Sequence, residues 1–375
     1  MMGGGAPSRR RQWEAHMPGD AFGPFPDKPT TLAWYPSPSL SDLIRRFAKK
    51  SPYNHLGIAL VDLSGGPSIG YAGWNDSRQI YVASLAKIGA MFAAFQLRKA
   101  VRAVSTQMRA VDADELWKSI ADAWKPAVSH RAPKRPADFP KLKNIFSAKR
   151  SGDQWEIDFT DNHDDWQQII KLGDGLPRGL GFRDRLKLMI GNSNNRAAAS
   201  CIDDIGFQYL NGALAAQGLF EGGSGGLWIA LDYGGHSWGS GVGGGWAQGA
   251  TAYSVARFLA LLETKQLVDL DSSNEMQDLM SFKGHYSSWF VNKLQTENRA
   301  PQRAYGKIGL DGTADDCAVI ERSPTIDGKP KLIRYGAVGL GASGDDVLNG
   351  LIMKLDECMI EDERMAKSGS KYLWP

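Results

Sequence analysis

The stretch YVASLAKIGAMFAAFQLRKAV (81–101) places Ser84 three residues before Lys87, at the start of an apolar run. Residues three apart share one face of a helix, so the hydroxyl of Ser84 and the amine of Lys87 can meet. A serine hydroxyl is a weak nucleophile until a base removes its proton, and a lysine whose pKa is lowered by burial can be that base. The spacing alone leaves open two solvated helix residues. The apolar flanks, which would bury the lysine, favour a nucleophile with its base.

A second polar group lies in GNSNN (191–195), just before the small-residue run RAAASCIDDIG. Ser193 and Asn195 alternate there, so a hydroxyl can relay a proton to a leaving group while an amide hydrogen-bonds substrate or the lysine. The alternative is an ordinary helix cap, because Asn and Ser are preferred at that position.

A third group lies in YGKIGLDG (305–312), a strand-like run that carries Lys307 and Gly309 with Leu310 next. The lysine would bring positive charge to a cleft, and the glycine would let a substrate approach the backbone closely. An edge-strand lysine without a catalytic role is the alternative reading of this motif taken alone.

In this order, S-x-x-K, S-x-N and K-x-G match the signature of penicillin-recognising serine enzymes. From about residue 40 to 360 the chain resembles class A serine β-lactamases and their penicillin-binding relatives, flanking helices and last strands included. The resemblance implies an α/β (α+β) fold. Its antiparallel sheet is built from both chain ends and flanked by helices, beside an all-helical region.

The resemblance also implies a role for each motif residue. Ser84 would be the acylated nucleophile, Lys87 its base and Ser193 a proton shuttle. The substrate-binding residues would include Asn195, Lys307, Gly309 and Leu310. The backbone N–H groups of Ser84 and Leu310 would form the oxyanion hole.

Two departures from the family pattern bear on the reaction. In class A β-lactamases an omega-loop glutamate activates the deacylating water, and counting forward puts that position near Trp228. The nearby acid with a plausible reach is Asp232, so we place both residues beside the substrate. Ile308 stands where the family has a Thr or Ser that binds a β-lactam carboxylate, and it cannot make that hydrogen bond. The acylation apparatus stays whole, whereas deacylation should be slow.

The organisation of the chain follows from composition and patterning. Residues 1–36 are rich in Gly, Pro and Arg and are interpreted as a disordered leader. Residues 37–375 form the catalytic unit, with its sheet part at 37–83 and 300–375, its helical part at 84–299, and an inserted cap at about 108–178. Asn194, at the middle of the S-x-N motif, replaces the family's Asp.

Bulk properties limit the partners. A net charge of +3 is too small to indicate nucleic acid or membrane binding, and we expect neither. Three distant cysteines are expected to be reduced thiols, and six histidines form no ligand cluster, so no cofactor or metal is expected. The basic N-terminal patch precedes no apolar segment, which favours a cytoplasmic protein unless a preceding segment has been removed.

These observations predict a serine hydrolase or acyl-transfer enzyme acting on a small-molecule or peptide-like ester, amide or lactone, with poor or no β-lactam turnover. One alternative is a true class A-like β-lactamase or penicillin-binding protein. The other is a non-catalytic binding protein that retains the fold. The oligomeric state stays open.

Overall fold

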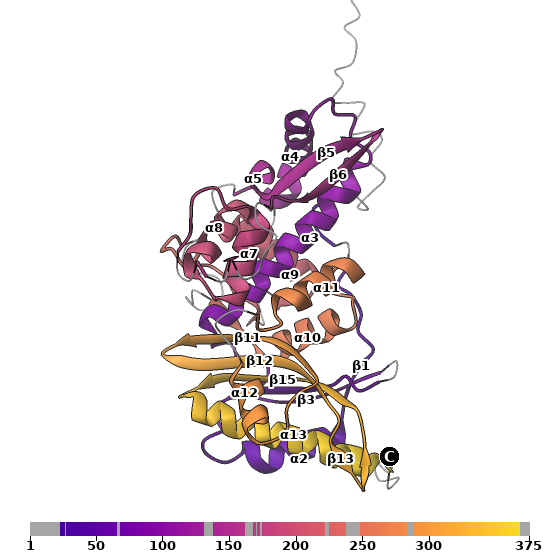
Figure 1. Ribbon diagram of the computed structural model, residues 1–375, viewed down its shortest axis with the longest axis vertical. Helices are drawn as coiled ribbons and strands as arrows, with labels where there is room; N and C mark the ends of the chain where they lie inside the picture. The colour runs from indigo at the N-terminus through magenta and orange to yellow at the C-terminus, as the bar shows by residue number, and fades with distance from the viewer. Residues whose placement is uncertain are drawn as a thin grey trace, which may run out of the picture.

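The computed structural model describes residues 23–26, 28–65, 68–130, 138–161, 168–169, 171–172, 175–221, 225–237, 248–283 and 288–367. A six-stranded sheet, ordered β1-β3-β2-β15-β12-β11, forms one half of the molecule (Figure 1). Its strands are β1 (Trp34–Pro36), β2 (Gly57–Asp62), β3 (Ile69–Trp74), β11 (Arg303–Asp311), β12 (Thr313–Arg322) and β15 (Ile333–Ala342). All neighbours pair antiparallel except β1 and β3, which are parallel. The predicted antiparallel sheet from both chain ends is therefore confirmed.

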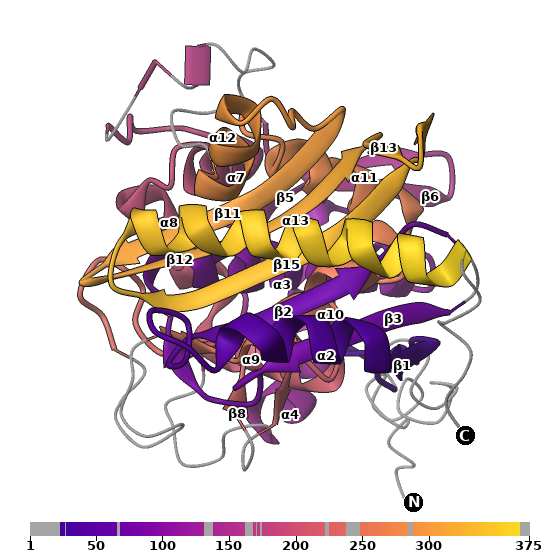
Figure 2. The same ribbon diagram turned by 90° about the horizontal axis from the view of Figure 1, so that it is seen from below.

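Helices cover both faces of this sheet. On one face lie α2 (Pro38–Ala48), α12 (Trp289–Thr296) and α13 (Asp345–Lys367), and Figure 2 shows α2 and α13 side by side across the strands. The hydroxyl of Ser37 caps α2 by accepting a hydrogen bond from the N–H of Leu40 at 3.4 Å. The other face packs against the larger apolar core, to which α3 (Lys87–Ser105) and α10 (Ala252–Glu263) contribute.

The remaining elements belong mainly to the helical half of the molecule. Its helices are α4 (Ala113–His130), α5 (Leu142–Ile145), α7 (Phe182–Gly191), α8 (Asn195–Ile205), α9 (Phe207–Ala216) and α11 (Leu270–Leu279). Short strands pair as β4 (Ile80–Tyr81), β9 (Trp228–Ile229) and β10 (Gln248–Ala250), as β5 (Phe146–Ser151) and β6 (Gln154–Phe159), as β7 (Phe220–Glu221) and β8 (Gly225–Gly226), and as β13 (Thr325–Ile326) and β14 (Lys329–Pro330).

The predicted leader is wrong over its described part. Residues 34–36 pair with β3 as strand β1, and the ring of Phe25 stacks on Tyr209 at 5.2 Å between centroids. The Tyr209 hydroxyl donates to the carbonyl of Pro24 at 2.9 Å. Aromatic and backbone contacts thus order a Pro-rich stretch whose composition alone predicts disorder. Residues 1–22 lie outside the described residues.

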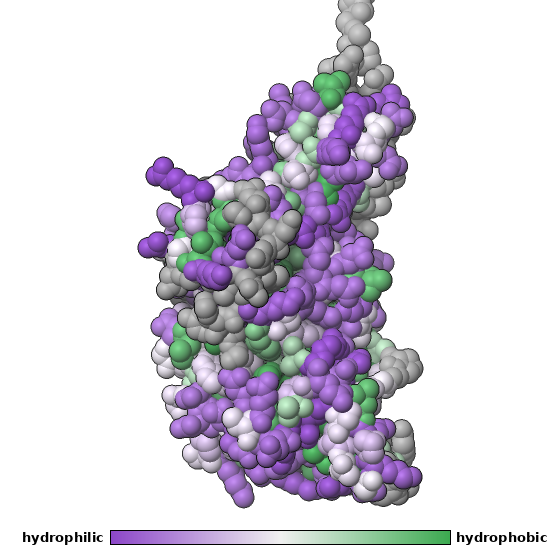
Figure 3. Space-filling model, viewed as in Figure 1, coloured by the Kyte–Doolittle hydropathy of each residue, from purple (hydrophilic) through white to green (hydrophobic). Residues whose placement is uncertain are grey.

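On the face shown in Figure 3, hydrophilic side chains predominate and apolar ones lie in small scattered groups. Within the described ranges, no helix combines the length and the apolar character that crossing a membrane requires.

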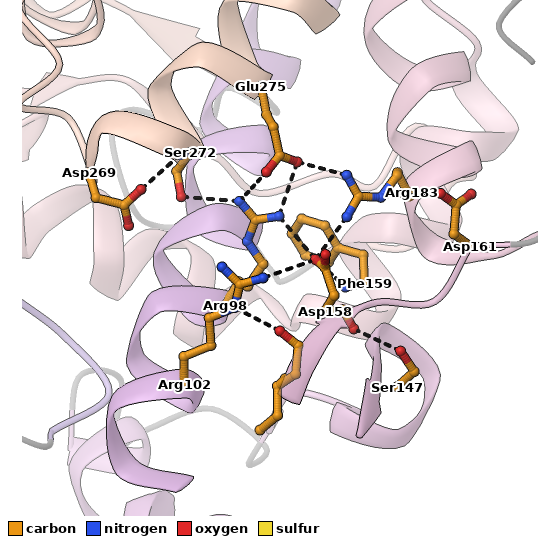
Figure 4. Close-up of polar contacts among 11 residues, drawn as sticks. Arg98, Arg102, Ser147, Asp158, Phe159, Asp161, Arg183, Asp269, Ser272 and Glu275 are labelled. Atoms are coloured by element: carbon orange, nitrogen blue, oxygen red, sulfur yellow. Dashed lines mark hydrogen bonds and ion pairs between the residues drawn. The ribbon is translucent and has the colours of Figure 1, made fainter. Parts of the chain in front are cut away.

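The insertion forms its own hairpin, β5–β6, beside the C-terminal half of α3 and away from the sheet (Figure 1). A charge network joins the hairpin to the body (Figure 4). Arg98 of α3, with no exposed side-chain area, donates to both carboxylate oxygens of Glu275 at 2.7 and 3.0 Å and to Asp158 of β6 at 3.1 Å. Arg183 also bonds both carboxylates, at 2.8 Å each. The hairpin is therefore held by ion pairs as well as by apolar packing.

Replacing Arg98 by methionine should lower the free energy of unfolding by about 2 kcal/mol, because it removes the hydrogen bonds of a buried guanidinium to two part-exposed carboxylates. The loss should not exceed this, since Arg183 still bonds both. Arg102→Met is the matched control on the same helix, because Arg102 is 43% exposed and its pair with Asp158 is longer, at 3.4 Å; it should cost about 1 kcal/mol or less. Urea unfolding measures both, and equal losses would contradict the buried role of Arg98.

Candidate active site

The three sequence motifs converge on the amine of Lys87. Ser84 lies in a 3-10 helix, η1 (Ala83–Ala86), which leads directly into α3, and Lys87 is the first residue of α3. The Lys87 Nζ atom lies 3.0 Å from Ser84 Oγ and 2.7 Å from Asn195 Oδ1 at the start of α8. It also donates to the carbonyl oxygen of Ser193, in the turn between α7 and α8. A possible nucleophile therefore lies within hydrogen-bonding distance of a possible base.

Burial makes Lys87 a plausible base. Its side chain has no exposed area, because it lies among the apolar residues of α3, whereas Ser84 is half-buried. Desolvation lowers the pKa of the Lys87 amine well below its usual value, and the charge of Lys307 lowers the pKa further. A neutral amine can accept the serine proton, and the half-buried hydroxyl can still meet a substrate.

Ser193 lies between the two lysines. Its hydroxyl oxygen accepts a hydrogen bond from Lys307 Nζ at 2.8 Å and lies 3.5 Å from Lys87 Nζ. Desolvation by burial lowers the pKa of Lys307 to about 7. Asn194 caps α8 by accepting from the N–H of Ala197 at 2.8 Å, which fixes the turn that carries Ser193. A hydroxyl between two amines can pass a proton in either direction.

Gly309 allows β11 to lie directly against η1. A Cβ atom added at Gly309 would lie 2.3 Å from the carbonyl oxygen of Val82 and 3.0 Å from the nitrogen of Leu85. This approach brings the backbone of the following residue, Leu310, alongside the segment that contains Ser84. This arrangement is compatible with the predicted oxyanion hole, which needs the backbone N–H groups of Ser84 and Leu310 close together.

Ile308 borders a small apolar recess rather than a carboxylate site. The recess, about 10 Å³ in volume, also touches Lys307. Its other lining residues come from α7, β11 and the end of α11 and the turn after it: Ile190, Gly191, Leu279, Met280, Phe282 and Gly306. No described residue that lines the recess carries a hydroxyl, so this side of Lys307 offers no hydroxyl to a substrate carboxylate.

Trp228 and Asp232, the other two predicted substrate contacts, are both buried. Trp228 is 2% exposed, pairs with Gly249 of β10, and stacks on Phe220 with 6.3 Å between ring centroids. It lies in the small sheet of β4, β10 and β9, and its contact with substrate stays a prediction. Asp232 is also 2% exposed, and its carboxylate accepts from the N–H groups of Gly234 and His236 at 2.7 and 2.9 Å. The carboxylate thus bonds its own loop, and its predicted contact with substrate stays a prediction.

Sequence reasoning missed Tyr233, which follows Asp232 in this loop. Its hydroxyl donates to the carbonyl oxygen of Ala83 at 2.8 Å, and its ring centroid lies 4.6 Å from Lys87 Nζ. Burial raises the pKa of the Tyr233 hydroxyl well above its usual value, so the hydroxyl stays a donor. The sequence signal that could have found Tyr233 is an aromatic residue inside the turn-forming run LDYGG, five positions after Trp228.

The site concentrates unfavourable backbone conformations. Ala83, Ser193 and Tyr233 have φ values of 40°, 53° and 67°, in the left-handed region that residues with a Cβ atom seldom adopt. All three contact the Lys87 amine or border Ser84. Such conformations persist only where surrounding contacts impose them, and they cluster at functional sites.

Among the described residues of the insertion, Gly175 reaches this site, where its carbonyl accepts a hydrogen bond from Asn194 Nδ2 at 3.4 Å. Its hairpin instead contacts Arg98 and Arg102, three to four helical turns along α3 from Lys87. A capping role for the insertion stays a prediction. Within the described ranges, no three His, Cys, Asp or Glu residues are grouped as metal ligands would be.

Comparisons with known proteins gave matches among solved structures. No family model matches the chain, and no curated protein matches it. A β-lactamase from Sphaerobacter thermophilus is 14% identical, with 90% of this chain and 98% of that chain covered and a TM-score of 0.46. A class A β-lactamase from Bacteroides cellulosilyticus is 12% identical, with 88% and 98% covered and a TM-score of 0.45. The structure of PBP-A is 14% identical, with 90% and 100% covered and a TM-score of 0.48.

Proposed function

We propose that this protein is a serine hydrolase or acyl-transfer enzyme that works through an acyl-Ser84 intermediate. The observation that carries the proposal is the buried amine of Lys87, 3.0 Å from Ser84 Oγ. A pair of surface residues would not bury the amine completely, nor give it partners from α8 and the preceding turn. The substrates we propose are small-molecule or peptide-like esters, amides or lactones.

The contacts support a reaction in two stages. Neutral Lys87 accepts the proton of Ser84 as Oγ attacks the carbonyl carbon, and the backbone N–H groups of Ser84 and Leu310 stabilise the oxyanion. The proton then passes from Lys87 through Ser193 to the leaving group, with Lys307 beside the Ser193 hydroxyl. In the second stage, water or another acceptor attacks the ester carbonyl, its proton passes to the leaving Ser84 Oγ, and the acyl group stays on the acceptor.

The proposal includes poor or no turnover of β-lactams. Ile308 offers no hydroxyl to the carboxylate of such a compound, and Asp232 is occupied by N–H groups of its own loop. Acylation would proceed, whereas deacylation would lack a held base, a group that contributes roughly 10²–10⁴-fold. We therefore propose that the protein does not degrade β-lactam antibiotics efficiently.

The test is intact-mass measurement after incubation with a fluorescent penicillin and, separately, with a fluorophosphonate. We expect an adduct of one label in the wild type, none in Ser84→Ala, and full labelling in Ser105→Ala. Ser105 is the matched control because it lies buried at the end of α3, the helix that follows η1, and its hydroxyl donates to Arg102 O at 2.9 Å.

The three candidate functions predict different results in these assays. A persistent penicillin adduct supports acylation without deacylation, whereas fast nitrocefin turnover would indicate a true β-lactamase. Equal inertness of wild type and Ser84→Ala toward the fluorophosphonate and an activated ester would overturn the enzymatic proposal in favour of a binding protein.

A further inference from the structure

Tyr233 contacts both Ala83, the residue before Ser84, and Lys87, the proposed base. Its hydroxyl bonds the carbonyl of Ala83 at 2.8 Å, and its ring lies over Lys87 with 4.6 Å from Nζ to the centroid. The loop of Tyr233 is 150 residues from Ala83 in the chain, so tertiary folding alone creates the contact. One side chain thus touches both groups on which the reactivity of Ser84 depends.

The hydroxyl contact fixes the direction of a backbone N–H. In a trans peptide the C=O and N–H groups point in opposite directions, so holding the carbonyl oxygen of Ala83 aims the N–H of Ser84 away from Tyr233. Ala83 is left-handed, with φ at 40°, which an alanine would leave if it were not held. The peptide that Tyr233 holds is the one whose N–H we assign to the oxyanion hole.

The ring contact acts on the amine. The titratable and polar groups facing Lys87 are Ser84 from η1, Ser193 and Asn195 around the start of α8, Lys307 from β11, and Tyr233. The ring excludes water from one side of the amine, which favours its neutral form. The ring face also attracts the cation that forms when the amine accepts a proton, but this attraction is smaller than the cost of removing water, so the ring lowers the pKa of the amine on balance.

The loop that carries Tyr233 is itself fixed. The Asp232 carboxylate accepts hydrogen bonds from the backbone N–H groups of Gly234 and His236. Its Oδ2 atom also lies 2.7 Å from His236 Nδ1. These bonds hold the turn on both sides of Tyr233, whose own φ is 67°. The side chain is thus directed at the site by its backbone.

We propose that Tyr233 is a positioning residue that orients the Ala83–Ser84 peptide through its hydroxyl and encloses the Lys87 amine with its ring. This rests on the proposed acyl-Ser84 chemistry and deepens it. Each half of the side chain has a separate effect, so two substitutions distinguish them. Tyr233→Phe removes the hydroxyl and keeps the ring, whereas Tyr233→Leu removes both.

The experiment measures the rate constant of Ser84 labelling by a fluorophosphonate as a function of pH. Tyr233→Phe should be about 10-fold slower than the wild type with an unchanged pH midpoint, because the amine stays covered. Tyr233→Leu should also be slow, with its midpoint about one pH unit higher, because water then reaches the amine. Tyr209→Phe, which removes a buried hydroxyl that donates to Pro24 O at 2.9 Å, is the control and should match the wild type.

Labelling of Tyr233→Phe within twofold of the wild type would overturn the inference, and so would an unchanged midpoint in Tyr233→Leu. If Tyr233→Leu does not fold, the labelling rate and the pH midpoint of Tyr233→Phe alone test the inference. Ser84-dependent labelling in the wild type with unaffected Tyr233 variants refutes this inference alone. Absence of Ser84-dependent labelling in the wild type refutes the proposed function as well.

Discussion

Replacement of Lys87 by methionine should slow fluorophosphonate labelling of Ser84 about 10³-fold. Methionine has nearly the length of lysine and suits the apolar surroundings of α3, so it removes the base without opening a large cavity. A positioned general base contributes roughly 10²–10⁴-fold, and Lys87 is the group 3.0 Å from the serine hydroxyl. Rates from stopped samples analysed by intact mass would measure the loss.

Lys99→Met is the matched control for this substitution. Lys99 lies on the same helix, is exposed, and donates to the carbonyl of Val268 at 2.8 Å. Its replacement should leave the labelling rate within about twofold. A Lys87→Met protein that labels as fast as Lys99→Met would show that another group deprotonates Ser84.

The pH dependence of wild-type labelling follows from the same amine. Desolvation, together with the charge of Lys307, lowers the pKa of Lys87 well below 10.5. Above that lowered pKa the amine is neutral and the rate should be constant. Below it the amine is protonated, so the rate should fall about tenfold per pH unit. Lys87→Met should lose this dependence, and a wild-type profile that rises only near pH 10.5 would contradict the lowered pKa.

Gly309→Ala should slow the same labelling about 10²-fold. The added Cβ would lie 2.3 Å from the carbonyl oxygen of Val82, closer than nonbonded atoms approach, and neither this backbone oxygen nor a Cβ bonded to Cα can rotate away. β11 must therefore move from η1, which separates the two N–H groups proposed for the oxyanion hole. Loss of one such donor costs roughly 10²–10³-fold.

Gly344→Ala controls for adding a methyl group to a glycine, because nothing lies within 4 Å of a Cβ at that position. It should label at the wild-type rate. Circular dichroism and thermal unfolding of both variants separate a displaced strand from a general loss of folding. If folded Gly309→Ala labels as fast as Gly344→Ala, the backbone of β11 does not stabilise the oxyanion.

Much of the fold could be predicted because its signals are local. The antiparallel sheet from both chain ends is confirmed, and the last strands and flanking helix are β11, β12, β15 and α13. Each of these elements is specified by side-chain periodicity within its own residues. The leader was predicted wrongly over its described part because its order comes from contacts with β3 and Tyr209.

The sequence by itself determined which residues are grouped at the candidate site: Ser84 with Lys87 by helical spacing, and the two later motifs by their order along the chain. Only the tertiary structure decided how these groups are buried and aimed. It placed Trp228 in a small sheet, used Asp232 to hold a turn, and turned Tyr233 toward Ala83 and Lys87. The contacts of Tyr233 join segments more than a hundred residues apart, and both Tyr233 and Ala83 have left-handed backbone that local preference disfavours. Residue spacing does not encode them, because the free energy that holds such conformations comes from packing of the whole chain.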